Sequence, residues 1–150
     1  MVIAAPTFDF LVVAPELVVL VTALLVMMVD LFLPRAQKRR LAWVALAGVV
    51  AAGVVAFFVW DGTDPTLHDM LAADGYALFV SLAILVAAAL ALLFSVDFAE
   101  RAGLPQGEYY TLFLLATAGM MLMAAAINLM TIFVALEILS IALYALVGLN

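Results

Sequence analysis

The 150-residue chain is 71% hydrophobic and 11% charged, whereas an ordinary soluble domain is roughly 45–50% apolar and about 25% charged. A soluble fold of this size could not bury so much apolar surface, so the composition indicates an integral membrane protein. The absence of cysteine excludes disulfides, thiol catalysis and thiolate metal sites, and a single histidine leaves little material for a metal centre. The net charge of −6 and the five basic residues leave no basic surface for nucleic acid.

Five apolar stretches are long enough to cross the bilayer, which takes about 20 residues of helix. They are apolar on every face, unlike the alternating strands of a barrel, and an open strand would leave backbone groups unpaired in lipid. The sequence therefore predicts an all-α fold, a polytopic transmembrane helix bundle. The expected spans are residues 16–33, 41–60, 76–94, 109–127 and 129–149.

The first span is expected to be retained in the membrane rather than cleaved as a signal peptide. A signal peptide has a positively charged segment before a short apolar core. The first 30 residues contain no Lys or Arg, and Asp9 and Glu16 lie where positive charges would be expected.

The connections are expected to be short, apart from two polar segments. Residues 61–75 hold four aspartates with Gly and Pro, which indicates an exposed loop, and residues 95–107 are again polar and rich in turn residues. Only Asn128 interrupts the apolar run between the fourth and fifth spans, so this turn must be tight.

The basic residues predict the orientation of the chain. Four of the five lie between positions 35 and 40, and basic residues in short loops stay on the cytoplasmic side. Alternating crossings then place the amino terminus and residues 61–75 outside, and residues 95–107 and the carboxy end inside.

Glu137 is the strongest candidate for chemistry, because it lies near the centre of the fifth span. Inserting a charged residue there costs roughly 2.5–3.5 kcal/mol, so such a group should face a polar cavity or a partner. A carboxyl that gains and loses a proton is what a proton relay requires. Ser140 and Tyr144 fall on the same helical face and are possible supporting residues, and Glu108 is a third possible supporting residue. The alternative, a carboxyl that only bonds a neighbouring helix for assembly, remains open.

The other carboxylates favour structural roles. Asp30 lies near the inner end of the first span, where Arg35 or Lys38 could pair with it. Glu16 and Glu108 each lie at a helix start, where carboxylates interact favourably with free N–H groups. Four residues are expected in an interfacial aromatic belt: Trp60, Tyr76, Tyr109 and Tyr110.

Three segments carry a resemblance to a known family. The segments GEYY (residues 107–110), GMMLMA (119–124) and LEILSIALY (136–144) closely resemble the fourth and fifth helices of subunit N of NADH–quinone oxidoreductase, or respiratory complex I. Residues 15–17 (PEL) and Asp30 also look like the first helix of that subunit. The resemblance covers residues 107–148 specifically and the rest of the chain loosely.

The resemblance implies an antiporter-like, proton-translocating subunit of the membrane arm in the bacterial cytoplasmic (inner) membrane. Its partners would be other membrane-arm subunits and the lipid bilayer. The chain itself would carry no cofactor, since NADH, flavin, iron–sulfur clusters and quinone belong to partner subunits. Glu137 matches the glutamate of the proton pathway, which pairs in the family with a lysine on the seventh helix.

The match divides the chain into helices one to three, residues 1–106, and the first two helices of an antiporter-like repeat, residues 107–150. The repeat is incomplete, and Lys38 cannot replace the family's lysine because it lies in the cytoplasmic loop. An amino-terminal fragment, a split gene and an incomplete record are the expected explanations. Two other functions remain open: a subunit of a multisubunit sodium/proton antiporter, and a purely structural membrane subunit.

Overall fold

The computed structural model describes residues 10–34, 37–60, 66–67 and 70–149. Five of its helices are long and apolar enough to cross a membrane, which confirms the predicted all-α bundle. In chain order the elements are η1 (Phe10–Val13), α1 (Ala14–Phe32), α2 (Arg40–Val59), β1 (Thr66–Leu67), β2 (Leu71–Ala72), α3 (Gly75–Arg101), α4 (Gln106–Ala125) and α5 (Leu129–Val147).

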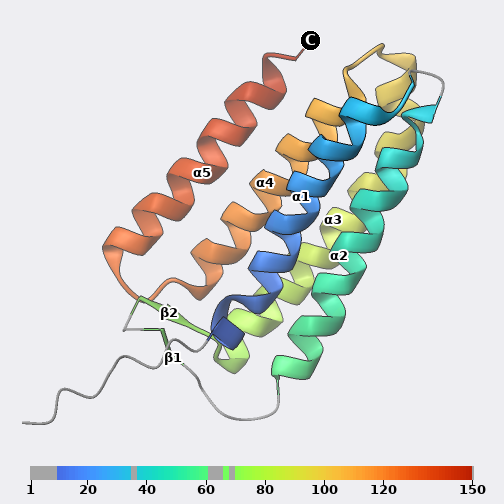
Figure 1. Cartoon of the computed structure of the whole chain (residues 1–150). Helices are drawn as coiled ribbons and strands as arrows, with labels where there is room; N and C mark the ends of the chain where they lie inside the picture. Colours follow the sequence, from blue (N-terminus) through green and yellow to red (C-terminus); the bar gives the residue numbers. More distant parts are fainter. Residues whose placement is uncertain (1–9, 35–36, 61–65, 68–69, 150) are drawn as a thin grey trace, which may run out of the picture.

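The five helices run alternately up and down along one axis, with α5 at one edge of the bundle (Figure 1). Helix α4 is central, because it packs against α1, α3 and α5, and α2 packs against α1 and α3. Small residues allow close approach between membrane helices. The backbone of Gly48 in α2 lies against the side chain of Thr22 in α1, so closely that a Cβ at position 48 would overlap it.

Helix α3 is longer than the sequence predicts, since it continues past residue 94 to Arg101. Its 27 residues span about 40 Å, which exceeds the roughly 30 Å of hydrocarbon. The apolar stretch marks only the part inside the membrane, whereas the helix continues into the interface. The helix continues through Ser95, whose hydroxyl donates to the carbonyl of Leu92 at 2.8 Å. Gly103, with φ of 67°, follows the helix end in the left-handed conformation that favours glycine.

The expectation of an exposed loop over residues 61–75 holds only in part for the described residues, because Met70 and Gly75 are exposed but the residues between them are buried or half-buried. Strands β1 and β2 pair antiparallel, and Leu71 and Ala73 are buried against Val12, Ala77 and Ala125. The backbone N–H of Ile127 donates to the carbonyl of Met70 at 2.9 Å. The segment therefore packs under the end of the bundle. The apolar residues between the aspartates, such as Leu71 and Ala73, are the feature of the sequence that corresponds to this packing.

Helices α4 and α5 are joined by the tight turn that the sequence predicts. Helix α4 begins at Gln106, three residues before the predicted Tyr109. The side chain of Asn128 accepts a hydrogen bond from the N–H of Thr131 at 2.8 Å, which caps the start of α5. The proposed division at residues 106–107 coincides with the start of α4 and stays a prediction.

Candidate functional site

Glu137 lies in the middle of α5 and points away from α4. The two buried residues of α5 are Ala135 and Ala142, and the α5 backbone from Ala135 to Leu139 lies against Gly119 of α4. A position two residues after Ala135 is about 200° around the helix. Glu137 is accordingly exposed.

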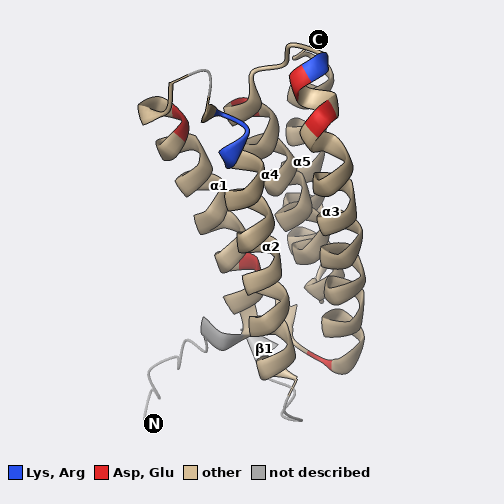
Figure 2. Ribbon diagram, turned by 90° about the vertical axis from the view of Figure 1, so that its right-hand side faces the viewer, with Lys and Arg blue, Asp and Glu red and all other residues tan. Residues whose placement is uncertain are grey.

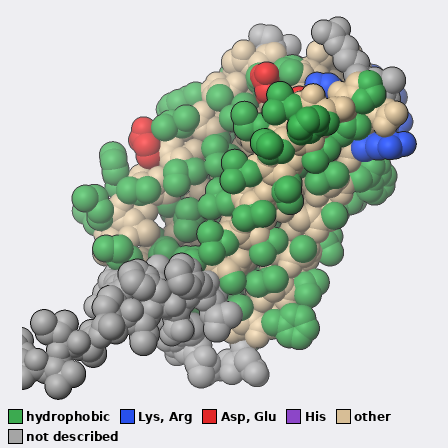
Figure 3. All heavy atoms as spheres, viewed as in Figure 1, with side chains coloured by type: hydrophobic (Ala, Val, Ile, Leu, Met, Phe, Trp, Pro, Cys, Tyr) green, Lys and Arg blue, Asp and Glu red, His purple; other side chains and the backbone are tan. Residues whose placement is uncertain are grey.

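Apart from Ser140 and Tyr144, the face that carries Glu137 is apolar. Phe133 and Ile141 are exposed on α5, and Figure 3 shows an isolated acidic side chain among hydrophobic ones over this helix. Among the described residues, no side chain forms a hydrogen bond or ion pair with Glu137. The carboxyl is thus presented outward at the middle of a membrane-spanning helix.

The supporting residues proposed from the sequence divide into two groups. Ser140 is half-buried and Tyr144 is 77% exposed, and their spacing places both on the side of α5 that carries Glu137. Glu108 is instead exposed in the first turn of α4, beside a cleft of about 420 Å³ that Ala145 also lines. Ala145 lies about 12 Å along α5 from Glu137, so the structure does not bring Glu108 to that carboxyl.

Asp30 forms the predicted ion pair with Lys38. Lys38 Nζ lies 2.8 Å from Asp30 Oδ1, and both side chains are mostly shielded from solvent. The carboxyl of Asp30 also lies directly against Gly107, where a Cβ would overlap it. Because Gly107 is in the first turn of α4, the free N–H groups and dipole of that helix favour a negative charge there. The pair therefore joins the α1–α2 turn to the start of α4. Arg35, the other predicted partner, lies outside the described residues.

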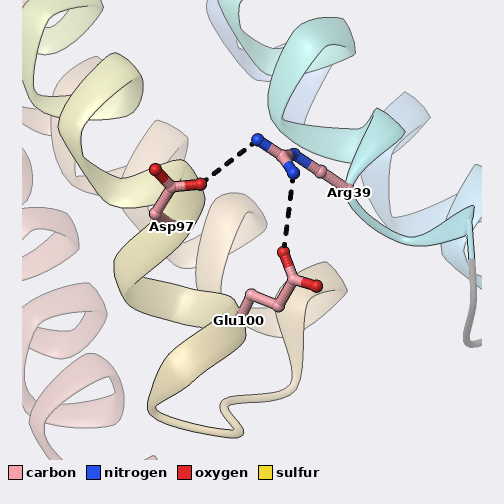
Figure 4. Close-up of polar contacts among 3 residues, drawn as sticks. All are labelled: Arg39, Asp97 and Glu100. Carbon is pink, nitrogen blue, oxygen red and sulfur yellow. Dashed lines mark hydrogen bonds and ion pairs between the residues drawn. The ribbon is translucent and has the colours of Figure 1, made fainter.

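Arg39, directly before the start of α2, forms ion pairs with α3 on the solvent-exposed side of the bundle end that holds the Asp30–Lys38 pair. Its guanidinium lies 3.2 Å from Asp97 and 3.9 Å from Glu100 (Figure 4). The Lys and Arg residues of the described chain gather at this one end of the bundle (Figure 2). The end is thus marked by charge, whereas the opposite end has no described basic residue.

Glu16 is a buried carboxyl that the sequence reasoning assigned to helix capping. It lies in the first turn of α1 but is only 4% exposed. Among the residues that the structure describes, none forms a hydrogen bond with its Oε2 atom. Glu16 has the i, i+4, i+7 spacing of one buried helical face with Val12, Val19 and Ala23.

Tyr110 also differs from its expected place in the aromatic belt, because it is 1% exposed in the core. Its ring meets that of Tyr109 edge to face, with centroids 5.2 Å apart. Trp60 and Tyr76 are exposed, as belt residues would be. His68 lies outside the described residues. No three His, Asp or Glu side chains of the described residues are grouped so that they could hold a metal ion.

Similarity to known proteins covers nearly the whole chain, although no family model matches it. The chain is 41% identical over 144 residues to NADH-quinone oxidoreductase subunit N of Trichlorobacter lovleyi, which covers 96% of this chain and 30% of the relative. It is 42% identical over 135 residues to the subunit N of Dehalococcoides mccartyi, with 89% and 28% covered. A subunit N 2 of Roseiflexus castenholzii is 36% identical over 146 residues, with 97% and 29% covered.

The agreement of these relatives in name, together with the five apolar helices, confirms the resemblance seen in the sequence. The chain spans about three tenths of the length of the curated relatives it matches. It is homologous, over nearly all of its own residues, to part of the subunit N family of NADH-quinone oxidoreductases.

Proposed function

We propose that this chain works in the membrane arm of an NADH-quinone oxidoreductase, where Glu137 takes up and releases a proton within the membrane. The redox chemistry, with its NADH, flavin, iron–sulfur clusters and quinone, takes place in partner subunits. This chain contributes a translocase function and holds no redox cofactor of its own. The names of the relatives support membership of such a complex.

The observation that carries the proposal is the position of the Glu137 carboxyl. It lies in the middle of α5 on the face turned away from α4. A charged side chain facing hydrocarbon at that depth costs roughly 2.5–3.5 kcal/mol. Further protein is therefore expected to cover this face and to supply a polar partner. Because the relatives are more than three times as long as the matched segment, we propose that the remainder of a subunit of that length supplies this cover.

Proton transfer through Glu137 is tested by substitution in the assembled complex. Glu137→Gln keeps the size and hydrogen bonding of the side chain but cannot titrate. We expect the complex to assemble in normal amounts, while proton uptake into inverted membrane vesicles falls at least twofold per quinone reduced. The measurement compares quenching of a pH-sensitive dye with the rate of quinone reduction. Glu137→Asp, which can still titrate, should retain part of the pumping.

The same experiment separates the competing functions. Normal pumping by Glu137→Gln would contradict a proton-transfer role and support a purely structural subunit. A sodium/proton antiporter subunit would instead give proton movement that depends on sodium ions and continues without quinone reduction. Repeating the vesicle assay with sodium gradients, and with a quinone-site inhibitor present, distinguishes this case.

The basic end of the bundle is proposed to face the cytoplasm, because basic residues in short loops stay inside. The chain has no cysteine, so single cysteines report the orientation directly. Ala102 and Met70 are exposed at opposite ends of the bundle. An impermeant maleimide should label Ala102→Cys only in inverted vesicles and Met70→Cys only in right-side-out vesicles. The reverse pattern would overturn the orientation.

A further inference from the structure

Glu16 interrupts a continuously buried, otherwise apolar face of α1. Along α1 and the turn before it, Val12, Glu16, Val19, Ala23 and Val26 are all buried, with the spacing of one helical face. Val12 belongs to the apolar cluster at the end of the bundle, and the three residues after Glu16 belong to the main apolar core. The carboxyl therefore lies between two apolar clusters.

Among the described residues, no side chain forms an ion pair with Glu16. No described residue donates a hydrogen bond to the Glu16 Oε2 atom, and every ion pair of the described chain joins residues at the other, basic end. Burying a carboxylate in an apolar environment without a counter-charge is strongly unfavourable, so binding a proton would make this position less costly. Helix capping, the role that the sequence favoured, does not require such burial.

The depth of Glu16 differs from that of Glu137. Helices α1 and α5 begin at the same end of the bundle (Figure 1), and both pack on α4. Glu16 is the third residue of α1 and Glu137 the ninth residue of α5, so Glu16 lies in the first turn of its helix, whereas Glu137 lies in the middle of its own. The basic end is the other end of the bundle, away from the end at which α1 and α5 begin.

We propose that Glu16 is a second proton-binding site of this chain, which holds a proton between the two apolar clusters and exchanges it during turnover. The step is reversible protonation of one carboxylate, with the proton passing to or from the side of the membrane opposite the basic end. The inference rests on the proposed function, because an exchangeable proton at this depth serves a translocating subunit. It adds a residue that Glu137 does not contact.

The first test compares Glu16→Gln with Glu16→Asp in the assembled complex. A proton-binding role predicts that Gln lowers the protons moved per quinone reduced at least twofold, whereas Asp retains more pumping because it titrates. A merely structural role predicts the opposite order, since Gln matches Glu in size and Asp does not. Normal pumping by Glu16→Gln would overturn the inference.

The matched control is Thr22→Val, on the same helix. Thr22 is buried, and its hydroxyl bonds only the carbonyl of Val18 within α1, at 2.7 Å. Valine keeps the shape and removes a polar group that cannot exchange a proton near neutral pH. Pumping by this variant should equal that of the unmodified complex. A loss equal to that of Glu16→Gln would attribute the effect to packing and overturn the inference.

An infrared measurement detects the protonation of the Glu16 carboxyl directly. Infrared difference spectra of the complex, recorded on adding the electron donor, should contain a carbonyl band of a protonated carboxylic acid that Glu16→Gln removes and Glu16→Asp displaces. If the complex with Glu16→Gln does not assemble, the shift of the carbonyl band in the Glu16→Asp variant tests the inference instead. A spectrum that neither variant changes would overturn the inference. If only Glu137→Gln loses pumping, this inference alone fails, and if neither variant does, the proposed function fails.

Discussion

Gly119 of α4 lies directly against the backbone of Leu139 in α5, so that a Cβ at position 119 would come within 3.0 Å of the Leu139 nitrogen. It would also lie 3.2 Å from the carbonyl oxygen of Ala135. This contact fixes which face of α5 meets the bundle. It thereby fixes the outward direction of Glu137, although neither glycine nor alanine takes part in any proton transfer.

Gly119→Val is expected to push α5 away from α4 and to destabilise the protein by about 1–3 kcal/mol, as overpacking of a tight contact does. The measurement is the thermal unfolding midpoint of the detergent-purified full-length protein. The control is Gly53→Val in α2, where a Cβ would meet nothing within 4 Å. Equal midpoints for the two variants would contradict the close contact.

Lys38→Met is expected to destabilise the start of α4, because it leaves the Asp30 carboxylate without its counter-ion. The side chains of this pair are 26% and 22% exposed, and an uncompensated, partly buried charge costs about 1–3 kcal/mol. The double variant Lys38→Met with Asp30→Asn should recover most of the loss.

The control for the Lys38 experiment is Arg39→Met, whose pair with Asp97 is exposed by 58% and 66%. Solvent-exposed pairs contribute only about 0–1 kcal/mol, so this change should move the unfolding midpoint little. A larger effect at Arg39 than at Lys38 would show that burial does not decide the strength of these pairs.

Gly107→Ala should disturb the same region from the other side, because the new Cβ would overlap the Asp30 carboxyl. The Asp30 side chain must then turn away from Lys38, and we expect a loss of about 1–3 kcal/mol. Gly75→Ala is the matched control, since Gly75 also lies in the first turn of a helix and a Cβ there meets nothing within 4 Å. The prediction fails if combining Gly107→Ala with Asp30→Asn restores none of the loss.

Tyr144→Phe and Ser140→Ala should lower proton pumping less than Glu137→Gln does. Each removes one hydroxyl on the Glu137 side of α5, and one hydrogen bond contributes only about 0.5–1.5 kcal/mol, whereas Glu137→Gln removes the titrating group itself. The vesicle assay described for Glu137 measures this. Thr131→Val is the control, because the Thr131 hydroxyl bonds Asn128 at the helix start instead. Unchanged pumping in both variants would remove them from the pathway.

Much of the fold follows from local properties of the chain. Each span is recognisable in the sequence from about 20 consecutive apolar residues. The turn at Asn128 and the Asp30–Lys38 pair are also predictable, because they involve residues close together in the sequence. The family likewise follows from short segments of α4 and α5. The sequence reasoning ended α3 too early, because it took the first polar residues as the helix end. Polar residues such as Asp97 lie outside the hydrocarbon but still belong to the helix.

The burial of Glu16 and the outward direction of Glu137 were decided by the packing of helices. Both residues are carboxyls in apolar helices, and hydropathy treats them alike, because a helix that is apolar all round has no face that the sequence marks as inside. The structure separates them: Glu16 falls within the buried stripe of α1, whereas Glu137 lies opposite the contact between Gly119 and α5. The side of a helix that meets a neighbour depends on contacts between residues far apart in the chain, and these exist only once the bundle has formed.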